Sequence, residues 1–334
     1  MQLKPPRSTW PRRHGRLTTG AIRLIGGIGL LAGLLIAGCA VPPAPPPTPP
    51  AAPTAGPPPV PKRPPRIGLA LGGGAARGFA HVGVIQVLEQ AGIRPDLVVG
   101  TSAGSLVAAL YASGMNGARL QRVAMTMEEA SFTDWMLPLF SRGMLRGNGL
   151  ARYVDREVGG KTIEAMPLPL GIVATDLHTG NGILFRRGDT GTAVRASSAV
   201  PAIFEPVRIS GHDYVDGGLV APVPVDYARQ MGAELVIAVD ISSSPQGNPT
   251  DDTLQILLQT FTIMGRSINR YQLRDADLVV RPNLAGITSA DFAARSQAIA
   301  AGREAMQAAL PQLRELIAAK SVPESGAATP PDSR

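Results

Sequence analysis

The segment VVGTSAGS, residues 98–105, predicts a strand that ends in a sharp turn and continues as a helix. An apolar run, Leu97–Gly100, comes before the turn, and small residues follow it. The turn fits the pattern of a nucleophile elbow, in which a strained strand-to-helix connection exposes a serine hydroxyl and requires small neighbours. Its residues are Gly100, Thr101, Ser102, Ala103 and Gly104. A tight turn with a capping Ser or Thr is the alternative, so other motifs must decide whether Ser102 is reactive.

Apolar runs bounded by turn residues alternate with helical patterns along the chain, which predicts an α/β fold with a mainly parallel sheet covered on both faces. The expected strands are Ile67–Leu71, Leu97–Gly100, Leu170–Ala174, Leu235–Asp240 and Leu278–Arg281, and the expected helices are 78–91, the segment after Ala103, 115–130, 222–231, 253–273 and 290–318. Functional loops in such sheets gather at the carboxyl ends of the strands. The elbow therefore lies where a site is expected.

The first 38 residues have the composition of a secretory signal peptide. They carry six Lys or Arg residues and no Asp or Glu, and they end in an apolar run over 21–38. Without them the formal net charge of +7 falls to +1, so the basic balance does not imply nucleic acid binding. An uncleaved membrane anchor is the alternative, because the apolar run is about the minimum length of a transmembrane helix.

Cys39, the single cysteine, follows Leu35-Ile36-Ala37-Gly38, a stretch that resembles the lipobox of bacterial lipoproteins. The resemblance implies cleavage before Cys39 and acylation of its thiol and of the new N-terminus. Several acyl chains anchor a protein stably, whereas one binds only marginally. Ala40 after the cysteine is typical of sorting to the outer membrane. We therefore expect a lipid-anchored protein of the bacterial cell envelope, on the periplasmic or surface face of the outer membrane.

The acylated cysteine and a proline-rich linker make up residues 39–65, which are too poor in large apolar residues to form a core. A spacer of this composition spans about 3.1 Å per residue. The polar segment 321–334 is expected to be disordered. Residues 66–320 remain as one folded domain, which is long enough to bury a sizeable core.

A glycine-rich turn, Leu71–Gly78 (LGGGAARG), leaves the first strand and opens a helix. Backbone N–H groups of such a turn can approach a ligand closely. A dinucleotide site would also need an acidic residue at the end of the second strand. That strand ends instead in Gly100-Thr101-Ser102, and Asp96 precedes it. We therefore expect no nucleotide cofactor.

A reactive serine needs a base, and two arrangements are open. Ser102, Asp176 and His212 would follow the chain order of an α/β-hydrolase triad, but only one strand precedes the elbow, whereas several do in that fold. The other candidate is Asp216, in Tyr214-Val215-Asp216-Gly217-Gly218, where a strand end delivers a carboxylate into a two-glycine turn. Alone, this motif is typical of a hairpin.

The glycine loop, the elbow serine and the later Asp-Gly-Gly together resemble the patatin-like phospholipases. The resemblance extends over most of 66–305 and includes Ala174-Thr175-Asp176-Leu177 and Arg195–Phe204. It implies a three-layer α/β/α sandwich that hydrolyses acyl esters of lipids, with no cofactor and no metal. By motif, Ser102 is the expected nucleophile and Asp216 its base, with Gly217 and Gly218 completing the aspartate motif. The expected oxyanion loop consists of Gly72, Gly73, Gly74, Arg77 and Gly78.

The chemistry of a Ser-Asp pair needs support from its surroundings. An ordinary Asp, with a pKa of about 3.9, is a weak base for an alcohol, so shielding from water and a helix N-terminus after Ser102 are expected to favour the alkoxide. The N–H groups of Gly73 and Gly74 are the expected oxyanion donors, each worth about 3 to 4 kcal/mol. Arg77 either assists them or only fixes the loop.

Other polar or amphipathic features have structural explanations. We expect His81 to pack or cap, Asp176 to organise the site, and His212 to lie in a hairpin turn. The helix over 253–273 either covers the core or forms a lipid-facing lid. A non-catalytic lipid-binding lipoprotein of the envelope remains the alternative to an enzyme acting on phospholipid or other acyl-ester lipids.

Overall fold

The computed structural model describes residues 62–127 and 143–323. The expected signal peptide, Cys39 and nearly all of the expected linker lie outside the described residues. Within them, no helix is long and apolar enough to cross a membrane. Just outside the expected domain bounds of 66–320, β1 (Lys62–Arg63) pairs antiparallel with β12 (Val322–Pro323).

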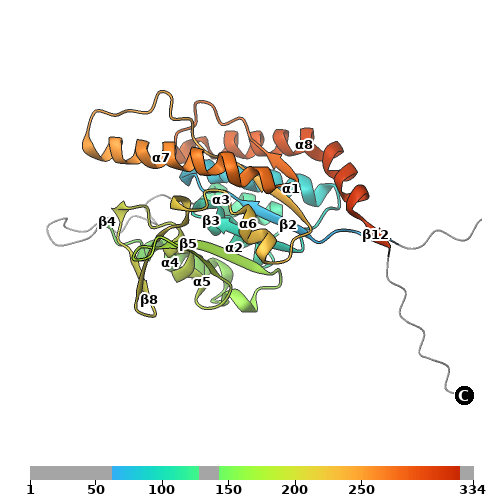
Figure 1. The fold of residues 1–334 in the computed structure, drawn as a ribbon, viewed down its shortest axis with the longest axis horizontal. Helices are drawn as coiled ribbons and strands as arrows, with labels where there is room; N and C mark the ends of the chain where they lie inside the picture. Colours follow the sequence, from blue (N-terminus) through green and yellow to red (C-terminus); the bar gives the residue numbers. More distant parts are fainter. Residues whose placement is uncertain (1–61, 128–142, 324–334) are drawn as a thin grey trace, which may run out of the picture. The chain divides into compact units, whose positions relative to one another are not determined.

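The centre of the domain is an eight-stranded sheet in which the order is β11-β10-β2-β3-β5-β9-β8, with β6 also paired to β5. Its parallel part comprises β11 (Leu278–Val280), β10 (Leu235–Val239), β2 (Ile67–Leu71), β3 (Leu97–Thr101) and β5 (Leu170–Asp176). The antiparallel strands are β9 (His212–Asp216), β8 (Val207–Ile209) and β6 (Gly182–Phe185). The mainly parallel sheet expected from the sequence is therefore confirmed (Figure 1).

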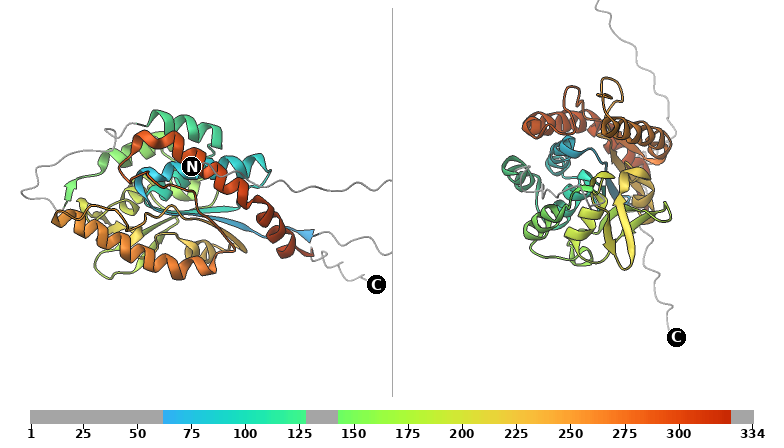
Figure 2. Two further views of the ribbon diagram at one scale, coloured as in Figure 1. Left: turned by 90° about the horizontal axis from the view of Figure 1, so that it is seen from above. Right: turned by 90° about the vertical axis from the view of Figure 1, so that its left-hand side faces the viewer.

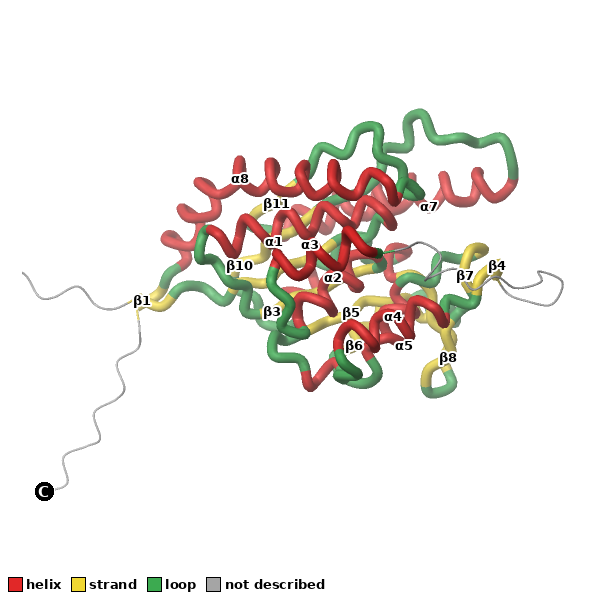
Figure 3. Tube along the Cα trace, turned by 180° about the vertical axis from the view of Figure 1, so that it is seen from behind, coloured by secondary structure: helices red, strands yellow, loops and turns green. Residues whose placement is uncertain are grey.

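Helices cover both faces of this sheet because alternate strand residues point to opposite sides. Leu69 and Leu71 of β2 pack in the large core cluster, whereas Ala70 packs in a second cluster. The large cluster includes residues of α1 (Ala80–Gln90), α2 (Ala103–Ala112), α3 (Gly117–Thr126), α4 (Asn148–Val158), α5 (Thr190–Ser197) and α8 (Arg295–Lys320). The second includes residues of α6 (Val225–Gln230). The three layers are visible in the views of Figures 2 and 3.

The shorter elements and one long peripheral helix complete the domain. The helix α7 (Thr253–Gln272) follows β10. Two-stranded pairing joins β4 (Gly143–Leu145) to β7 (Ala202–Phe204). The short 3-10 helices are η1 (Ala75–Phe79), η3 (Ile163–Ala165), η4 (Gly217–Leu219), η5 (Leu273–Asp275) and η6 (Phe292–Ala294).

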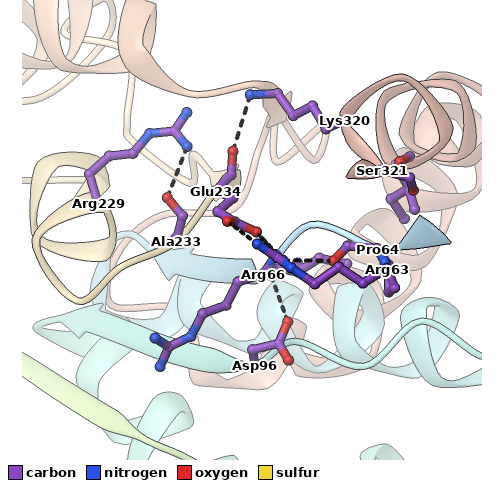
Figure 4. Close-up of polar contacts among 11 residues, drawn as sticks. Arg63, Pro64, Arg66, Asp96, Arg229, Ala233, Glu234, Lys320 and Ser321 are labelled. Carbon is purple, nitrogen blue, oxygen red and sulfur yellow. Dashed lines mark hydrogen bonds and ion pairs between the residues drawn. The ribbon is translucent and has the colours of Figure 1, made fainter. Parts of the chain in front are cut away.

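A polar cluster closes the end of the sheet where the described chain begins (Figure 4). The Arg63 guanidinium donates to both carboxylate oxygens of Glu234 at 2.7 Å, and the Arg66 N–H donates to the same carboxylate at 2.7 Å. Lys320, at the end of α8, donates to the Glu234 carbonyl at 3.1 Å. The hydrogen bonds from the Arg63 guanidinium and the Arg66 N–H lower the pKa of Glu234 to about 2. The cluster thus holds the first described residues against β10 and α8, at the amino ends of the parallel strands.

Candidate active site

Strand β5 brings two distant residues together. Its residue Val173 pairs with Thr101 at the end of β3, and its next residue, Ala174, pairs with Asp216 at the end of β9. Ser102 follows Thr101 directly, so consecutive positions of β5 place the serine and the aspartate side by side. The Ser102 hydroxyl is close enough to the Asp216 carboxylate to lower its pKa. The structure therefore joins the two side chains that the motifs single out.

Ser102 has the strained backbone of a nucleophile elbow, with φ 53° and ψ −123°. A non-glycine residue in such a conformation costs about 1 to 3 kcal/mol and persists only where its surroundings fix it. Here the Ser102 N–H donates to Ser197 Oγ at 2.8 Å, and Ser105 Oγ donates to the Ser102 carbonyl at 2.6 Å. A Cβ on Gly104 would collide with the Leu71 carbonyl, which explains the small residue after the turn.

Asp216 is buried, with 6% of its surface exposed. Its Oδ1 accepts the Gly218 N–H at 2.6 Å, and its carbonyl accepts the Thr175 hydroxyl at 2.8 Å. Burial raises the pKa of Asp216 to about 6, although the hydrogen bonds from Gly218 and Ser102 act in the opposite direction. The carboxylate is therefore a stronger base than an ordinary aspartate while still ionised at neutral pH.

The glycine loop corrects one expectation about the oxyanion donors. The Gly72 N–H donates to the Val239 carbonyl at 3.1 Å, and the Gly73 N–H donates to the Pro222 carbonyl at 2.9 Å. Neither group can therefore hold an oxyanion. The Gly74 N–H has no hydrogen bond within residues 62–127 and 143–323. The loop does adjoin the serine, since a Cβ on Gly73 would lie 3.1 Å from Ser102 Cβ.

Arg77 and Gly78 fix the loop. The Arg77 guanidinium donates to the backbone carbonyls of Ile241, Ser242 and Ile287 at 2.8 to 3.2 Å, which supports the loop-fixing role rather than a direct role in catalysis. Burial lowers the pKa of Arg77, and Asp240 partly offsets this effect. A Cβ on Gly78 would lie 2.8 Å from Ala103 Cβ, so this glycine allows η1 to pack against the start of α2.

His81 holds the same loop from the core side. Its side chain is fully buried, and its Nε2 lies 2.8 Å from the Gly72 carbonyl oxygen. Burial lowers the pKa of His81 to about 4, so the ring is neutral at pH 7. Because a carbonyl only accepts, Nε2 carries the proton. Its Nδ1 is buried without a partner within the described residues.

The triad expected for an α/β-hydrolase is not assembled. Asp176 Oδ2 and His212 Nδ1 do pair, at 2.9 Å, and Asp176 Oδ1 also accepts the His178 and Thr179 N–H groups at 2.9 Å. However, His212 and Asp216 occupy opposite ends of β9, which places them about 13 Å apart. Since Ser102 lies beside Asp216 across β5, the Asp176–His212 pair organises the antiparallel edge instead. His212 begins this strand just after the turn at Ser210 and Gly211.

Two buried hydroxyl groups support the turn at Ser102, and the elbow motif points to only one of them, Thr101. Ser197 is fully buried; its hydroxyl accepts the Ser102 N–H and donates to the Val173 carbonyl at 2.6 Å. Thr101 is also fully buried and donates to the Ala221 carbonyl at 2.8 Å. Ser197 lies within the stretch Arg195–Phe204 that carried part of the resemblance, but nothing in its neighbours reveals a contact 95 residues away.

The fold and site define a three-layer α/β protein with a strained serine beside a buried aspartate at the strand ends. Residues 69–229 match the family model described as patatin-like phospholipase. This part of the chain, residues 69–229, belongs to the patatin-like phospholipase family. The match includes the glycine loop, Ser102 and Asp216.

Individual relatives agree with this assignment. An uncharacterized NTE family protein of Mycobacterium tuberculosis is 35% identical over 207 residues, which are 61% of this chain and 56% of that protein. Patatin-like phospholipase domain-containing protein 6 of Homo sapiens is 35% identical over 232 residues, 67% of this chain and 16% of that protein. The crystal structure of VipD from Legionella pneumophila shares the fold, with a TM-score of 0.52 at 16% identity, covering 75% of this chain and 68% of that chain. The chain thus spans only about half the length of the mycobacterial relative.

Proposed function

We propose that the chain is a lipid acyl hydrolase that cleaves membrane lipid esters with Ser102 as nucleophile and Asp216 as base. The observation that carries the proposal is that neighbouring positions of β5 place the strained Ser102 beside the buried Asp216 carboxylate. Membership of the patatin-like phospholipase family supports the lipid ester as substrate.

The first half-reaction transfers the acyl group to the serine. Asp216 takes the hydroxyl proton as Ser102 Oγ attacks the ester carbonyl carbon, and the developing oxyanion is held by the Gly74 N–H and the positive N-terminus of α2. When the tetrahedral intermediate collapses, the bond from carbon to the alcohol oxygen breaks. Asp216 returns its proton to this oxygen, and the alcohol part of the lipid leaves.

Water completes the reaction by the same route. Asp216 deprotonates a water molecule as it attacks the acyl-enzyme, the bond to Ser102 Oγ breaks, and the proton passes to the serine. The fatty acid leaves and the enzyme is regenerated. The pKa of Asp216, raised to about 6, favours both proton transfers, because a general base works best when its pKa lies near the operating pH.

The cellular setting is proposed on sequence grounds. Cleavage before Cys39 and its acylation would anchor the domain to the envelope membrane, where its substrate is also located. Because acylation requires the thiol, Cys39→Ser is expected to move the protein from the outer-membrane fraction of a bacterial host to the soluble fraction. Retention in the membrane would favour an uncleaved anchor.

The decisive experiment compares lipid products by mass spectrometry. We expect free fatty acid and a deacylated lipid from the wild type, at least a thousandfold less from Ser102→Ala and Asp216→Ala, and undiminished product from His212→Ala. A fluorophosphonate should label Ser102 in the wild type. Loss of activity in His212→Ala but not in Asp216→Ala would favour the triad alternative. Equal products from all variants, without labelling, would favour a lipid-binding protein that is not an enzyme.

A further inference from the structure

One face of α7 exposes apolar side chains to solvent. The described residues include seven large hydrophobic side chains that are exposed, and four of them lie on this helix, with exposed fractions of 48 to 65%. At 100° per residue these four positions fall within about 100° of each other around the helix. We call them the α7 stripe: Ile256, Ile263, Met264 and Tyr271. Thr260 and Ser267, which share this face, are exposed as well.

The α7 stripe faces solvent because the opposite face of α7 packs against the domain and hydrogen-bonds to it. Asn269 Nδ2 donates to Ser242 Oγ at 2.8 Å, and Gln272 Nε2 donates to the Val220 carbonyl at 3.1 Å. A Cβ on Gly265 would lie 3.5 Å from the Pro222 ring. Pro222 also accepts the Gly73 N–H of the glycine loop. The helix therefore packs on the segment that follows Asp216.

The charge on α7 has one sign. Within α7 (Thr253–Gln272) there are two arginines, Arg266 and Arg270, and no Asp or Glu; Arg274 follows in η5, and Asp251, Asp252 and Asp275 flank the helix at its ends. Arg266, Arg270 and Arg274 are all exposed, and none of them takes part in an ion pair within the part of the chain that the structure describes. The Arg274 guanidinium lies 5.0 Å from the centre of the Tyr271 ring. Cations thus border an apolar stripe, which is the pattern of a helix that lies in the interface of an anionic membrane.

The position of α7 agrees with such a role. Figures 1 and 3 place the start of α7 at the end of the domain where β4 lies, whereas the pair β1–β12 lies at the opposite end. The parallel strands begin near β1 and end toward β4, so Ser102 and the N-terminal half of α7 share one end of the domain. A membrane contacted by α7 would therefore be close to the serine.

We propose that the α7 stripe inserts into the headgroup region of an anionic membrane and thereby holds the Ser102 end of the domain at the lipid surface. The inference rests on the proposed function for the use of this contact, but membrane binding itself can be measured separately. A second copy of the chain fits the stripe less well, because neither α7 helix has an acidic residue between Thr253 and Gln272 that could pair with Arg266 or Arg270 of the other copy.

A fluorescent probe tests the insertion directly. Because the chain has a single cysteine, Cys39→Ser with Ile263→Cys gives one site for an environment-sensitive dye. We expect a blue shift of the dye on vesicles of phosphatidylcholine with phosphatidylglycerol, quenching by lipids brominated in the acyl chain, and a smaller effect on phosphatidylcholine alone. The control is Cys39→Ser with Arg119→Cys on α3, whose dye should stay in water even if the N-terminal segment binds the vesicle.

Activity tests the consequence. Ile256→Ser, Ile263→Ser and Met264→Ser combined should lower hydrolysis of vesicle lipid at least tenfold and leave hydrolysis of a soluble short-chain ester unchanged. The matched control, Met125→Ser with Leu177→Ser, changes two exposed apolar side chains elsewhere and should affect neither substrate. Arg266→Glu with Arg270→Glu should remove the preference for anionic vesicles, whereas Arg119→Glu with Arg314→Glu should keep it.

The outcomes separate this proposal from the proposed function. A dye at position 263 that stays in water on vesicles carrying the bound chain overturns the membrane contact, whatever the activity. A blue shift without vesicles that grows with protein concentration assigns the stripe to a second copy of the chain instead. Insertion in a protein that hydrolyses neither vesicle lipid nor soluble ester would support the contact and refute the enzyme.

Discussion

Asp216 and His81 are buried titratable residues whose pKa values are shifted in opposite directions. Burial raises the pKa of Asp216 from 3.8 to about 6 and lowers that of His81 from 6.5 to about 4. As the pH falls from 6 to 4, the folded state gains stability from protonation of Asp216, while the unfolded state gains it from protonation of His81. Each shift corresponds to about 3 kcal/mol, so the two effects nearly cancel in the wild type.

Asp216→Asn is expected to separate these effects. The amide of asparagine is uncharged, so its burial avoids the cost of removing a charged carboxylate from water. At pH 7.5 the variant should therefore have a free energy of unfolding about 3 kcal/mol higher than the wild type. The advantage should disappear near pH 4, where the native carboxyl of the wild type is protonated. Urea denaturation at both pH values measures it, with Asp251→Asn, at an exposed position, as the control. A difference that is the same at both pH values would contradict the raised pKa.

The raised pKa also predicts the pH dependence of the reaction. Asp216 must be ionised to accept the Ser102 proton, so kcat/KM for a soluble ester should fall below about pH 6. An unshifted aspartate would keep activity down to about pH 4. The profile is measured between pH 4 and 8 on a substrate that does not titrate, after confirming that the enzyme stays folded. A fall in kcat/KM that begins only near pH 4 would contradict the raised pKa of Asp216.

His81 is expected to act as a positioning residue for the glycine loop. His81→Phe removes the donor to the Gly72 carbonyl and should lower kcat about tenfold to a hundredfold with little change in KM, because the loop positions the oxyanion donor. His81→Gln keeps a donor and should restore part of the loss. The control His178→Phe changes an exposed ring and should alter neither constant. Equal kcat in both His81 variants and the wild type would exclude the role.

At the level of elements, the contact between α1 and α8 depends on two glycines. A Cβ on Gly83 would collide with the Ile299 carbonyl, and one on Gly302 with the Ala80 carbonyl. Backbone atoms cannot yield as a flexible side chain can, so Gly83→Ala should cost about 3 kcal/mol of stability. The same substitution at Gly265, in α7, meets only the Pro222 ring at 3.5 Å and should stabilise by up to about 1 kcal/mol. Thermal denaturation of both variants measures the two changes in stability. Changes of the same sign would contradict the prediction.

The sequence predicts the parallel strands well but not the small elements around them. The ends of β2 agree with Ile67–Leu71, because both faces of this strand are buried and its residues form a continuous apolar run. In contrast, α5 (Thr190–Ser197) is rich in Thr, Gly and Ser, which favour helices poorly. Tertiary packing of Ala193 and Val194 stabilises it. The strand β6 has only four residues and depends on pairing with β5.

In the candidate site, too, some features follow from local sequence and others depend on the fold. Local motifs identify Ser102, Asp216 and the glycine loop, because an elbow and an Asp-Gly-Gly turn need particular residues next to each other. The hydrogen bond of the Gly73 N–H cannot be predicted from neighbouring residues, since its acceptor, the Pro222 carbonyl, lies 149 residues further along the chain. Ser197 likewise acts only through the fold. Sequence patterns therefore point to the proposed nucleophile and base, whereas the groups that orient these two side chains require the structure.

On the scale of the whole molecule, the chain enters the domain at the end opposite the serine. Figure 4 shows the cluster around Arg63 and Glu234 that fixes this point. A domain of this size is about 45 Å across. If Cys39 anchors the chain, the 22 residues between it and Lys62 span up to about 70 Å as a proline-rich spacer. The linker is therefore long enough to let the far end of the domain, with Ser102 and α7, reach the same membrane.

Shortening the linker should separate membrane activity from chemistry. Deletion of residues 44–57 leaves eight linker residues, which reach about 25 Å, less than the width of the domain. Hydrolysis of lipids in the anchoring membrane should fall at least tenfold, while hydrolysis of a soluble ester stays unchanged. A shuffled segment with the same number of prolines should restore the activity, because only the reach of the spacer matters. In a Cys39→Ser background without the signal peptide, the deletion should have no effect on either substrate. An anchored deletion variant that remains fully active on membrane lipid would mean that the serine can face the membrane without the spacer.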